Sequence, residues 1–208
     1  MRILKQPRAL ATREKIADAA ADLFALKGYH DTKLDEIITA AGATTGAFFH
    51  HFLSKEDLAF AVIDRHMERR RERLDQIEQG LPELSDADPL EHVFRRLGAV
   101  AEMLRQRGNR KGGCVIGNLS TALCDTHDGF RRRLSACFDE MALEFKPHLD
   151  AAARKHCPKR RVDTWELARY AVAIIEGSIM LSRARQDRRM VGRNFDHLKE
   201  YIKQSMKA

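Results

Sequence analysis

Features typical of membrane, secreted and zinc-binding proteins are missing from this sequence. No apolar run among the 208 residues approaches the roughly 18 needed to span a membrane. The charged N-terminus is not followed by the apolar stretch of roughly 7–15 residues that marks a secretory signal. The four cysteines lie 10, 13 and 20 residues apart without a C-x-x-C pair, which favours free thiols over disulfides or a zinc site. We expect a cytoplasmic protein without a membrane partner or a cofactor.

Proline is also scarce, and none of the five prolines lies between Pro7 and Pro82. Apolar residues recur three and four positions apart over most of the chain, and no stretch alternates in the manner of a β-strand. This pattern predicts an all-α protein of about nine helices. One of them is expected to run from Phe130 to Leu149, with a kink at Pro147.

The excess of positive charge is small and spread along the chain. Lys and Arg number 37 against 30 Asp and Glu, a formal net charge of +7, which is compatible with a polyanionic partner. Residues 1–56 hold 8 basic and 7 acidic residues, although residues 1–13 are basic without an acidic residue. The other basic runs, 65–73, 154–161 and 183–193, are typical of solvated helix faces and loops. Net charge alone therefore does not identify a partner.

Helix-start and helix-stop signals near the N-terminus predict a helix-turn-helix. A first helix ends at Gly28, and a capping box at 32–35 begins a short second helix. Residues 41–43 turn the chain into another short helix, from Thr44 to His51, and a capping box at 54–57 begins a long helix. A short helix after such a turn is the element that enters the DNA major groove. We expect residues 1–56 to form a three-helix DNA-binding domain, with its motif at about 33–52, and residues 57–208 to form a larger helical domain.

Residues 12–58 carry a specific resemblance to a known family. The matching segments are Thr12-Arg-Glu-Lys-Ile-Ala-Asp-Ala-Ala, Leu23-Phe-Ala-Leu-Lys-Gly-Tyr29, Ala40-Ala-Gly-Ala-Thr-Thr-Gly-Ala-Phe-Phe-His-His-Phe52 and Ser54-Lys-Glu-Asp-Leu58. Together they resemble the TetR/AcrR family of bacterial transcriptional regulators. Farther along, Gly113-Cys-Val-Ile-Gly-Asn-Leu119 and the region 176–178 resemble an LmrA/YxaF-like subgroup. The resemblance implies double-stranded operator DNA and a second copy of the chain as partners.

The resemblance also implies which side chains meet the DNA. Residues at the start of the second helix and Lys55 would contact phosphates, and the first residues of the third helix would lead it into the groove. Phe49 stands where the family commonly has a tyrosine; it lacks the hydroxyl, a loss of about 1 kcal/mol per phosphate contact, for which we hypothesise that His50 or His51 compensates. The expected DNA-binding residues are Arg13, Thr32, Lys33, Thr44, Thr45, Gly46, Phe49, His50, His51 and Lys55.

Two other interpretations of this segment are less favoured. A metal site at His50 and His51 is not expected, because adjacent side chains on a helix diverge by about 100° and no ligand cluster is nearby. Phe48 and Phe52 are expected to fill the core of the small domain, although exposed aromatic side chains could also stack on bases.

The helix that begins at Trp165 is apolar almost all round as far as Leu181. One face is expected to pack inside the subunit and another to meet a partner copy, in a four-helix arrangement with the last helix. The alternative is a helix buried entirely within one subunit. The expected interface residues are Leu167, Ala171, Ile174, Ser178, Leu181, Phe195, Leu198 and Ile202.

The resemblance also implies that the larger domain senses a ligand, so we expect a cavity among the fifth to eighth helices that binds an unidentified small organic effector. Candidate contacts are residues suited to an irregular, mostly apolar lining with a few polar anchors: Met67, Met103, Cys114, Asn118, His127, Trp165, Glu176 and Met180. Each of them has an alternative role as core filler, helix cap or surface residue. Cys114 follows Arg110 and Lys111, so a thiol of lowered pKa that senses electrophiles or oxidants is an alternative there.

The sequence lacks a glycine-rich phosphate loop, an H-E-x-x-H motif and a nucleophile elbow, so we do not expect an enzyme. The predicted function is a homodimeric, sequence-specific repressor that leaves a palindromic operator when its effector binds. The alternatives are a thiol-sensing repressor that acts through Cys114 and a nonspecific architectural DNA-binding protein.

Overall fold

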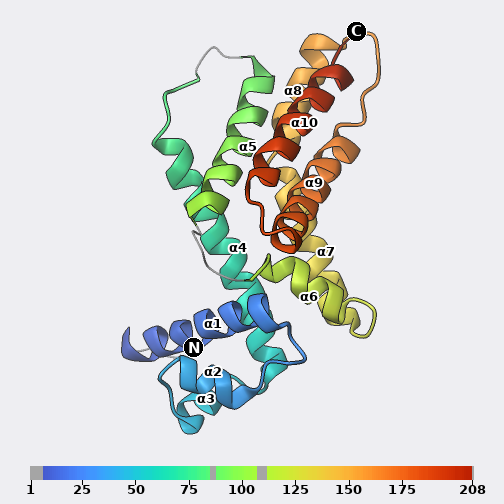
Figure 1. The fold of residues 1–208 in the computed structure, drawn as a ribbon. Coiled ribbons are helices and arrows are strands. Elements are labelled where there is room, and N and C mark those ends of the chain that lie inside the picture. The colour runs from blue at the N-terminus through green and yellow to red at the C-terminus, as the bar shows by residue number, and fades with distance from the viewer. Residues whose placement is uncertain (1–6, 85–87, 107–111, 208) are drawn as a thin grey trace, which may run out of the picture. The chain divides into compact units, whose positions relative to one another are not determined.

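The computed structural model describes residues 7–84, 88–106 and 112–207, and all regular structure within these ranges is α-helical (Figure 1). None of the described helices is long and apolar enough to cross a membrane. The helices are, in chain order, α1 (Pro7–Lys27), α2 (Leu34–Ala40), α3 (Thr45–His51), α4 (Lys55–Gln79), α5 (Pro89–Gln106), α6 (Val115–Leu123), α7 (Asp128–Leu143), α8 (Lys146–His156), α9 (Thr164–Ala184) and α10 (Arg189–Ser205).

The chain divides into two compact units. The first consists of residues 1–69 and 111–134, and the second of residues 70–110 and 135–208. The first unit thus combines α1, α2, α3 and α6 with the beginnings of α4 and α7. The second combines α5, α8, α9 and α10 with the ends of α4 and α7. A domain boundary at residues 56 and 57 stays a prediction from the sequence.

The structure confirms the all-α class and has ten helices in the described ranges, one more than the nine expected. The extra helix arises where one helix was predicted from Phe130 to Leu149. Here α7 ends at Leu143, and α8 begins at Lys146 with Pro147 in its first turn. A proline inside a helix clashes with the carbonyl four residues earlier, which is that of Leu143. Pro147 therefore begins a new helix instead of kinking a continuous one.

The second helix also begins one residue later than predicted. Lys33 is the N-cap of α2, and its backbone N–H donates to Glu36 Oε2 at 3.1 Å. Thr32, the expected cap, is buried and donates its hydroxyl to the carbonyl of Gly28 at 2.7 Å. The predicted Ser54 cap of α4 is confirmed, because Asp57 N donates to Ser54 Oγ at 3.1 Å. The Asp57 carboxylate closes the turn by accepting from Leu53 N, one residue before the cap.

Phenylalanine side chains hold the N-terminal helices together. Phe24 of α1, Phe48 of α3 and Phe52 at the end of α3 are fully buried, together with Ile16 and Ile37. The rings of Phe48 and Phe52 lie 5.7 Å apart. The core role predicted for these two residues is confirmed, and it leaves the opposite side of α3 to face outward.

The start of α6 packs against the end of α1 in the first unit. The carbonyl oxygen of Ala25 accepts a hydrogen bond from Gly113 N at 3.1 Å and another from Asn118 Nδ2 at 2.8 Å. Carbonyls in the last turn of a helix have no partner within the helix, so these bonds cap α1. Gly112 has φ +105°, and a Cβ there would lie 3.0 Å from the Ala25 carbonyl, so the close approach requires glycine.

The second unit is a packed layer of helices, in which α9 lies along α10 and α5 along α8 (Figure 1). Its core contains Leu97, Phe145, Leu149, Phe195 and Ile202, all of them buried.

Candidate DNA-binding site

The third helix presents a polar outer side above the buried phenylalanines. Thr44 is its N-cap, and the Thr44 hydroxyl accepts a hydrogen bond from Ala47 N at 3.1 Å. The residues whose side chains or backbone are exposed on this segment are Thr44, Thr45, Gly46, Phe49 and His50. Phe48 is buried and Phe49 is 54% exposed, which follows from the turn of about 100° between successive residues of a helix.

The turn before this helix depends on one glycine. Gly42 has φ +60°, in the left-handed region that disfavours other residues. Its N–H donates to the carbonyl of Thr39, and that of Ala43 to the carbonyl of Ile38, so the last carbonyls of α2 are satisfied. The glycine thus ends α2 and fixes the direction in which α3 leaves it.

Aromatic rings hold two cations close to α3. The guanidinium carbon of Arg13 lies 5.1 Å from the centre of the Phe52 ring, and Lys55 Nζ lies 4.3 Å from the centre of the Tyr29 ring. Burial lowers the pKa of Lys55, and the charge of Asp31 partly offsets this. Both side chains are half-buried, so the surrounding structure already restricts their rotamers.

The remaining predicted contacts differ in accessibility. Lys33 is exposed and His51 is half-buried, with its ring 4.9 Å from that of His50. Thr32 is only 1% exposed and its hydroxyl is bonded to Gly28, so it positions the start of α2 and is poorly placed for a phosphate. No group of three or more His, Cys, Asp or Glu in the described ranges could hold a metal ion.

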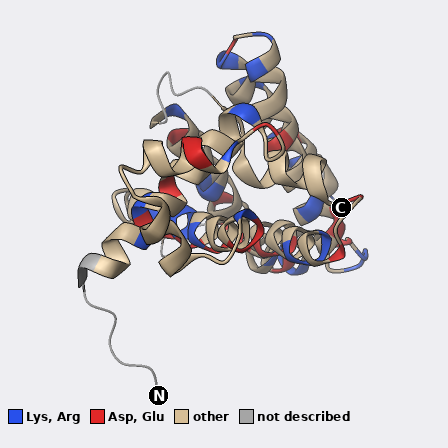
Figure 2. Ribbon diagram, turned by 90° about the horizontal axis from the view of Figure 1, so that it is seen from below, with Lys and Arg blue, Asp and Glu red and all other residues tan. Residues whose placement is uncertain are grey.

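Leu53, which the sequence did not single out, is 86% exposed between α3 and α4. The sequence could have indicated this exposure, because Leu53 directly follows Phe52, which was predicted to be buried, and successive residues at a helix end point in different directions. Basic and acidic residues are interspersed over the ribbon in Figure 2. The sequence of α3 contains no Lys, Arg, Asp or Glu, so its outer side carries small polar, histidine and aromatic groups.

The eight predicted effector residues are divided between the two units. Met67, Cys114, Asn118 and His127 belong to the first unit, whereas Met103, Trp165, Glu176 and Met180 belong to the second. Asn118 is bonded to α1, and His127 Nε2 lies 2.9 Å from Glu56 Oε1 while its Nδ1 accepts from Phe130 N. Met67 is buried, Met180 is 64% exposed, and Trp165 carries the Arg169 guanidinium 4.7 Å above its ring.

Most of the predicted interface residues are buried within one chain. Leu167, Ala171, Ser178, Phe195, Leu198 and Ile202 are all buried, whereas Ile174 is half-buried and Leu181 is exposed. The exposed apolar side of α9 consists instead of Tyr170, Ala173, Met180 and Leu181, with Ile174 and Gly177 half-buried between them. Tyr201 of α10 is also exposed, with its ring 5.0 Å from that of Tyr170. Their spacing of three and four residues was visible in the sequence, but a helix apolar on all sides gives no indication of which side is outside.

The second unit contains an open cleft of about 510 Å³ lined by α4, the residues after it, α5 and α8. The lining residues are Asp75, Glu78, Gln79, Glu83, Leu84, His92, Arg95 and His148. None of the predicted effector residues is among them.

Comparison with known proteins identifies both parts of the chain. Residues 16–62 match the bacterial regulatory proteins of the tetR family, and residues 89–198 match the tetracyclin repressor-like C-terminal domain.

Relatives extend along most of the chain. The HTH-type transcriptional regulator in the lacX 3′ region of Lactococcus lactis subsp. lactis is 29% identical over 90% of this chain and 91% of its own length. The HTH-type transcriptional regulator LmrA of Bacillus subtilis is 27% identical over 82% of this chain and 86% of its own length, in agreement with the predicted resemblance. The structure of a TetR transcriptional regulator from Chloroflexus aurantiacus superposes with a TM-score of 0.79 and 28% identity, over 96% of this chain and 98% of that one. With a helix-turn-helix exposed at α3 and a matching C-terminal domain, the chain belongs to the TetR family of DNA-binding transcriptional regulators, which are not enzymes.

Proposed function

We propose that the protein is a homodimeric repressor that binds a palindromic operator through α3 and is released when a small organic effector binds its C-terminal helices. The observation that carries the DNA-binding part is the exposed side of α3, which is fixed from behind by Phe48 and Phe52. Arg13, Lys33 and Lys55 supply phosphate contacts around it. Thr44, Thr45, Gly46, Phe49, His50 and His51 supply the groove-facing surface.

Selection of duplexes from a random pool by the full-length protein tests this function. A dimeric repressor enriches an inverted repeat whose half-sites lie about one or more helical turns apart, and the enriched duplex stays bound at moderate salt. Enrichment without a sequence pattern would instead identify a nonspecific architectural protein, whose binding falls steeply with salt.

His50 is expected to contribute directly to operator affinity because its exposed ring has no buried role in the described structure. His50→Ala should weaken binding to the selected duplex about tenfold or more, since one base contact contributes about 1–3 kcal/mol and a dimer has two. Fluorescence anisotropy with labelled duplex measures the change. His197→Ala, which removes an exposed histidine from α10, is the matched control and should bind like the wild type. Equal affinities for all three proteins would rule out the contact.

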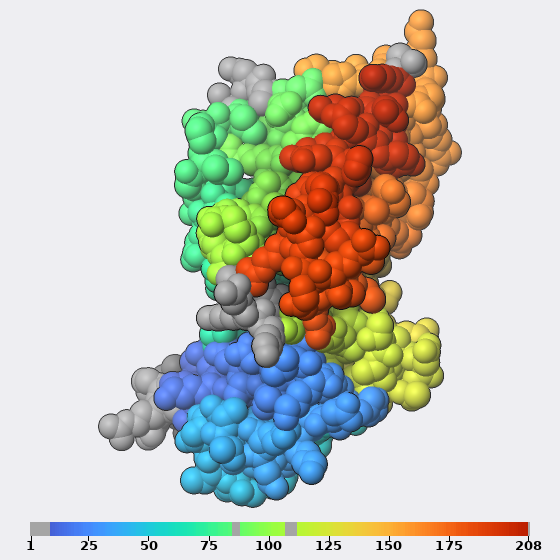
Figure 3. All heavy atoms as spheres, in the orientation of Figure 1, coloured from blue at the N-terminus to red at the C-terminus, as the bar shows by residue number. Residues whose placement is uncertain are grey.

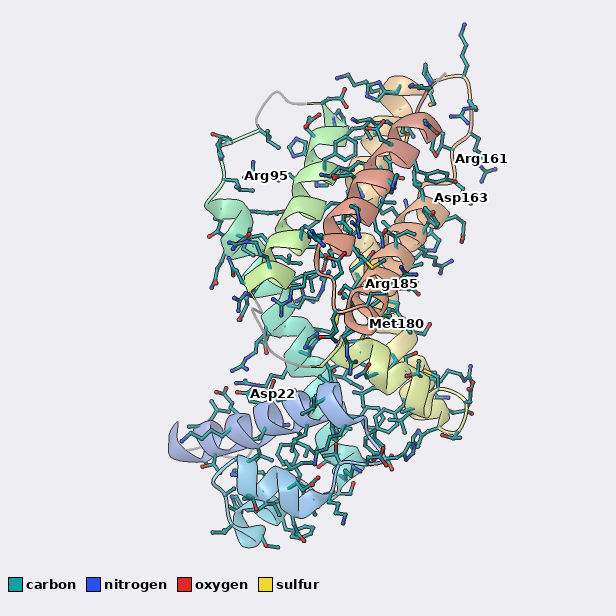
Figure 4. The ribbon with its side chains drawn as sticks, viewed as in Figure 1. Asp22, Arg95, Arg161, Asp163, Met180 and Arg185 are labelled. Carbon is teal, nitrogen blue, oxygen red and sulfur yellow. The ribbon has the colours of Figure 1, made fainter. Side chains whose placement is uncertain are left out.

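The dimer part of the proposal uses the exposed side of α9, from Tyr170 to Leu181, together with Tyr201 of α10. Figure 3 shows α9 and α10 side by side at the surface of the second unit, and Figure 4 labels Met180 on α9. An apolar patch of this kind is typical of a surface that pairs with another chain. The patch includes Tyr170, Tyr201 and Met180, and tyrosine and methionine are among the residue types enriched at interfaces.

Met180→Glu should dissociate the dimer, because each two-fold interface would then bury two uncompensated carboxylates. Analytical ultracentrifugation should show the wild type as a dimer. The dissociation constant of the dimer should be at least about tenfold higher for the variant. Leu143→Glu adds the same charge at an exposed leucine of α7 and should leave the dimer intact. A dimeric Met180→Glu protein would place the interface elsewhere.

Coupling from effector to DNA is proposed to use the hydrogen bonds that tie α6 to α1, because α6 precedes α7, which continues into the second unit. No specific observation favours the thiol-sensing alternative. Cys114 is 9% exposed at the start of α6, and Arg110 and Lys111 lie outside the described residues.

A further inference from the structure

The cleft in the second unit has a lining that accepts hydrogen bonds more than it donates them. Three carboxylates line it, those of Asp75, Glu78 and Glu83. Arg95 is the one guanidinium among the lining residues, and Arg96 lies behind them. Three carboxylates against two guanidinium groups leave one net negative charge on this wall.

Both guanidinium groups are already committed to the protein. Arg95 lines the cleft, but its guanidinium donates to the backbone carbonyls of Glu78, Leu81 and Pro82 and so caps the end of α4; Figure 4 labels it beside this connection. Arg96 pairs with Asp75 at 3.5 Å and with Glu78 at 3.1 Å. The Glu83 carboxylate is exposed and has no ion pair or hydrogen bond in the described structure.

Two histidines complete the lining of the cleft. The rings of His92 on α5 and His148 on α8 stack in parallel, with centres 5.0 Å apart and planes within 8°. Burial lowers the pKa of His148, as do the charges of His92 and Arg96. A neutral imidazole offers a nitrogen that accepts a hydrogen bond. The nearby Leu84 adds the one apolar side chain of the lining.

We propose that this cleft binds a small hydrophilic organic cation of the polyamine type. Its ammonium groups would donate to Glu83, to Asp75 and to an imidazole nitrogen, while its methylene chain packs on Leu84. An anionic ligand would meet the Glu83 carboxylate, which has no ion pair in the described structure, and a large apolar ligand would find little apolar lining. The proposal names a site and a ligand class for the effector, so it rests on the effector part of the proposed function.

Titration of the full-length protein with spermidine by isothermal calorimetry, at 0.15 M NaCl and pH 7.5, tests the site. We expect saturable binding with a dissociation constant of about 1 mM or tighter. The neutral 1,8-octanediol and the anionic succinate should not bind. Absence of spermidine binding at 10 mM, or equal binding of the diol, would overturn the proposal.

Matched variants separate the cleft from general charge attraction. Asp75→Asn/Glu83→Gln removes two carboxylates of the cleft, and Glu68→Gln/Glu72→Gln removes two exposed carboxylates of α4 outside it. The first pair should weaken spermidine binding about tenfold or more, since a charge-assisted hydrogen bond contributes about 1.5–3 kcal/mol. The second pair should change it less than twofold. Equal weakening of spermidine binding by the two double variants would mean that spermidine is attracted by the overall charge of the protein and not by the cleft. Glu83→Gln alone, at an exposed position, keeps the test valid if the double variant is unstable.

Operator binding distinguishes this proposal from the proposed function. If wild type binds the selected duplex but not spermidine, the cation site is wrong and the DNA-binding function stands. If it binds spermidine but no duplex, the repressor function fails and the site remains. Spermidine that weakens duplex binding in the wild type, but not in Asp75→Asn/Glu83→Gln, would support both.

Discussion

Arg70→Met is expected to lower the free energy of unfolding by about 3 kcal/mol. Arg70 of α4 forms an ion pair with Glu144, which lies between α7 and α8, and the two side chains are 7% and 16% exposed. Glu144 Oε2 is buried and already has no hydrogen-bond partner. Removal of the guanidinium would therefore leave a carboxylate that is both desolvated and uncompensated. Urea unfolding followed by circular dichroism measures the loss.

The adjacent arginine provides the control. Arg71 is 62% exposed and its nearest approach to Glu140 is 3.7 Å, so Arg71→Met should change stability by less than about 0.5 kcal/mol. Arg70→Met/Glu144→Leu should recover much of the loss, because both charges are removed together. If Arg70→Met were as stable as Arg71→Met, the buried pair would have no structural role.

The second large effect concerns neighbouring phenylalanines. Phe48→Ala should destabilise the N-terminal helices by about 3–5 kcal/mol, because it empties a fully buried ring site against Phe52. Phe49→Ala removes a ring that is 54% exposed and should cost less than about 1 kcal/mol. Thermal unfolding of both variants tests the difference.

The order of the two variants should reverse when operator affinity is measured in place of stability. At a temperature where both variants are folded, Phe49→Ala should bind the selected duplex more weakly than Phe48→Ala does, since Phe49 faces outward on α3. A Phe49→Ala protein with wild-type affinity would remove Phe49 from the DNA-binding surface. Phe49→Tyr, which adds the hydroxyl common in the family, should strengthen binding by about 1 kcal/mol if the ring lies beside a phosphate.

Local signals in the sequence were sufficient for the N-terminal helices. Gly28, Gly42 and the cap at Ser54 mark helix ends through backbone chemistry that acts within four residues. The cap of α2 was predicted one residue too early, at Thr32. The sequence does not show whether the Thr32 hydroxyl caps α2 or bonds back to the carbonyl of Gly28, as it does in the structure. Pro147 was recognised as a disturbance, but whether proline kinks or separates helices depends on packing on both sides of it.

The C-terminal helices show the limit of pattern reasoning. The interface was assigned to residues such as Leu167 and Phe195, which are buried within the subunit. A helix that is apolar all round, like α9, has no polar side to mark the solvent. The effector residues were chosen by type, and type does not tell a methionine in a core from one on a surface, as Met67 and Met180 demonstrate.

The sequence by itself determined that this protein is all-α, that its N-terminal segment is a helix-turn-helix and that it belongs to a family of DNA-binding regulators. The first two properties follow from spacing and caps within single helices, which are local, and the third from the resemblance carried by residues 12–58. Only the tertiary structure decided which side of α9 is exposed, that Asn118 is held by α1, and that carboxylates and stacked histidines from three helices line one cleft. Those properties depend on contacts between residues far apart in the chain. The hydrophobic effect that creates these contacts is non-directional, so the sequence pattern does not show which apolar side chains will meet.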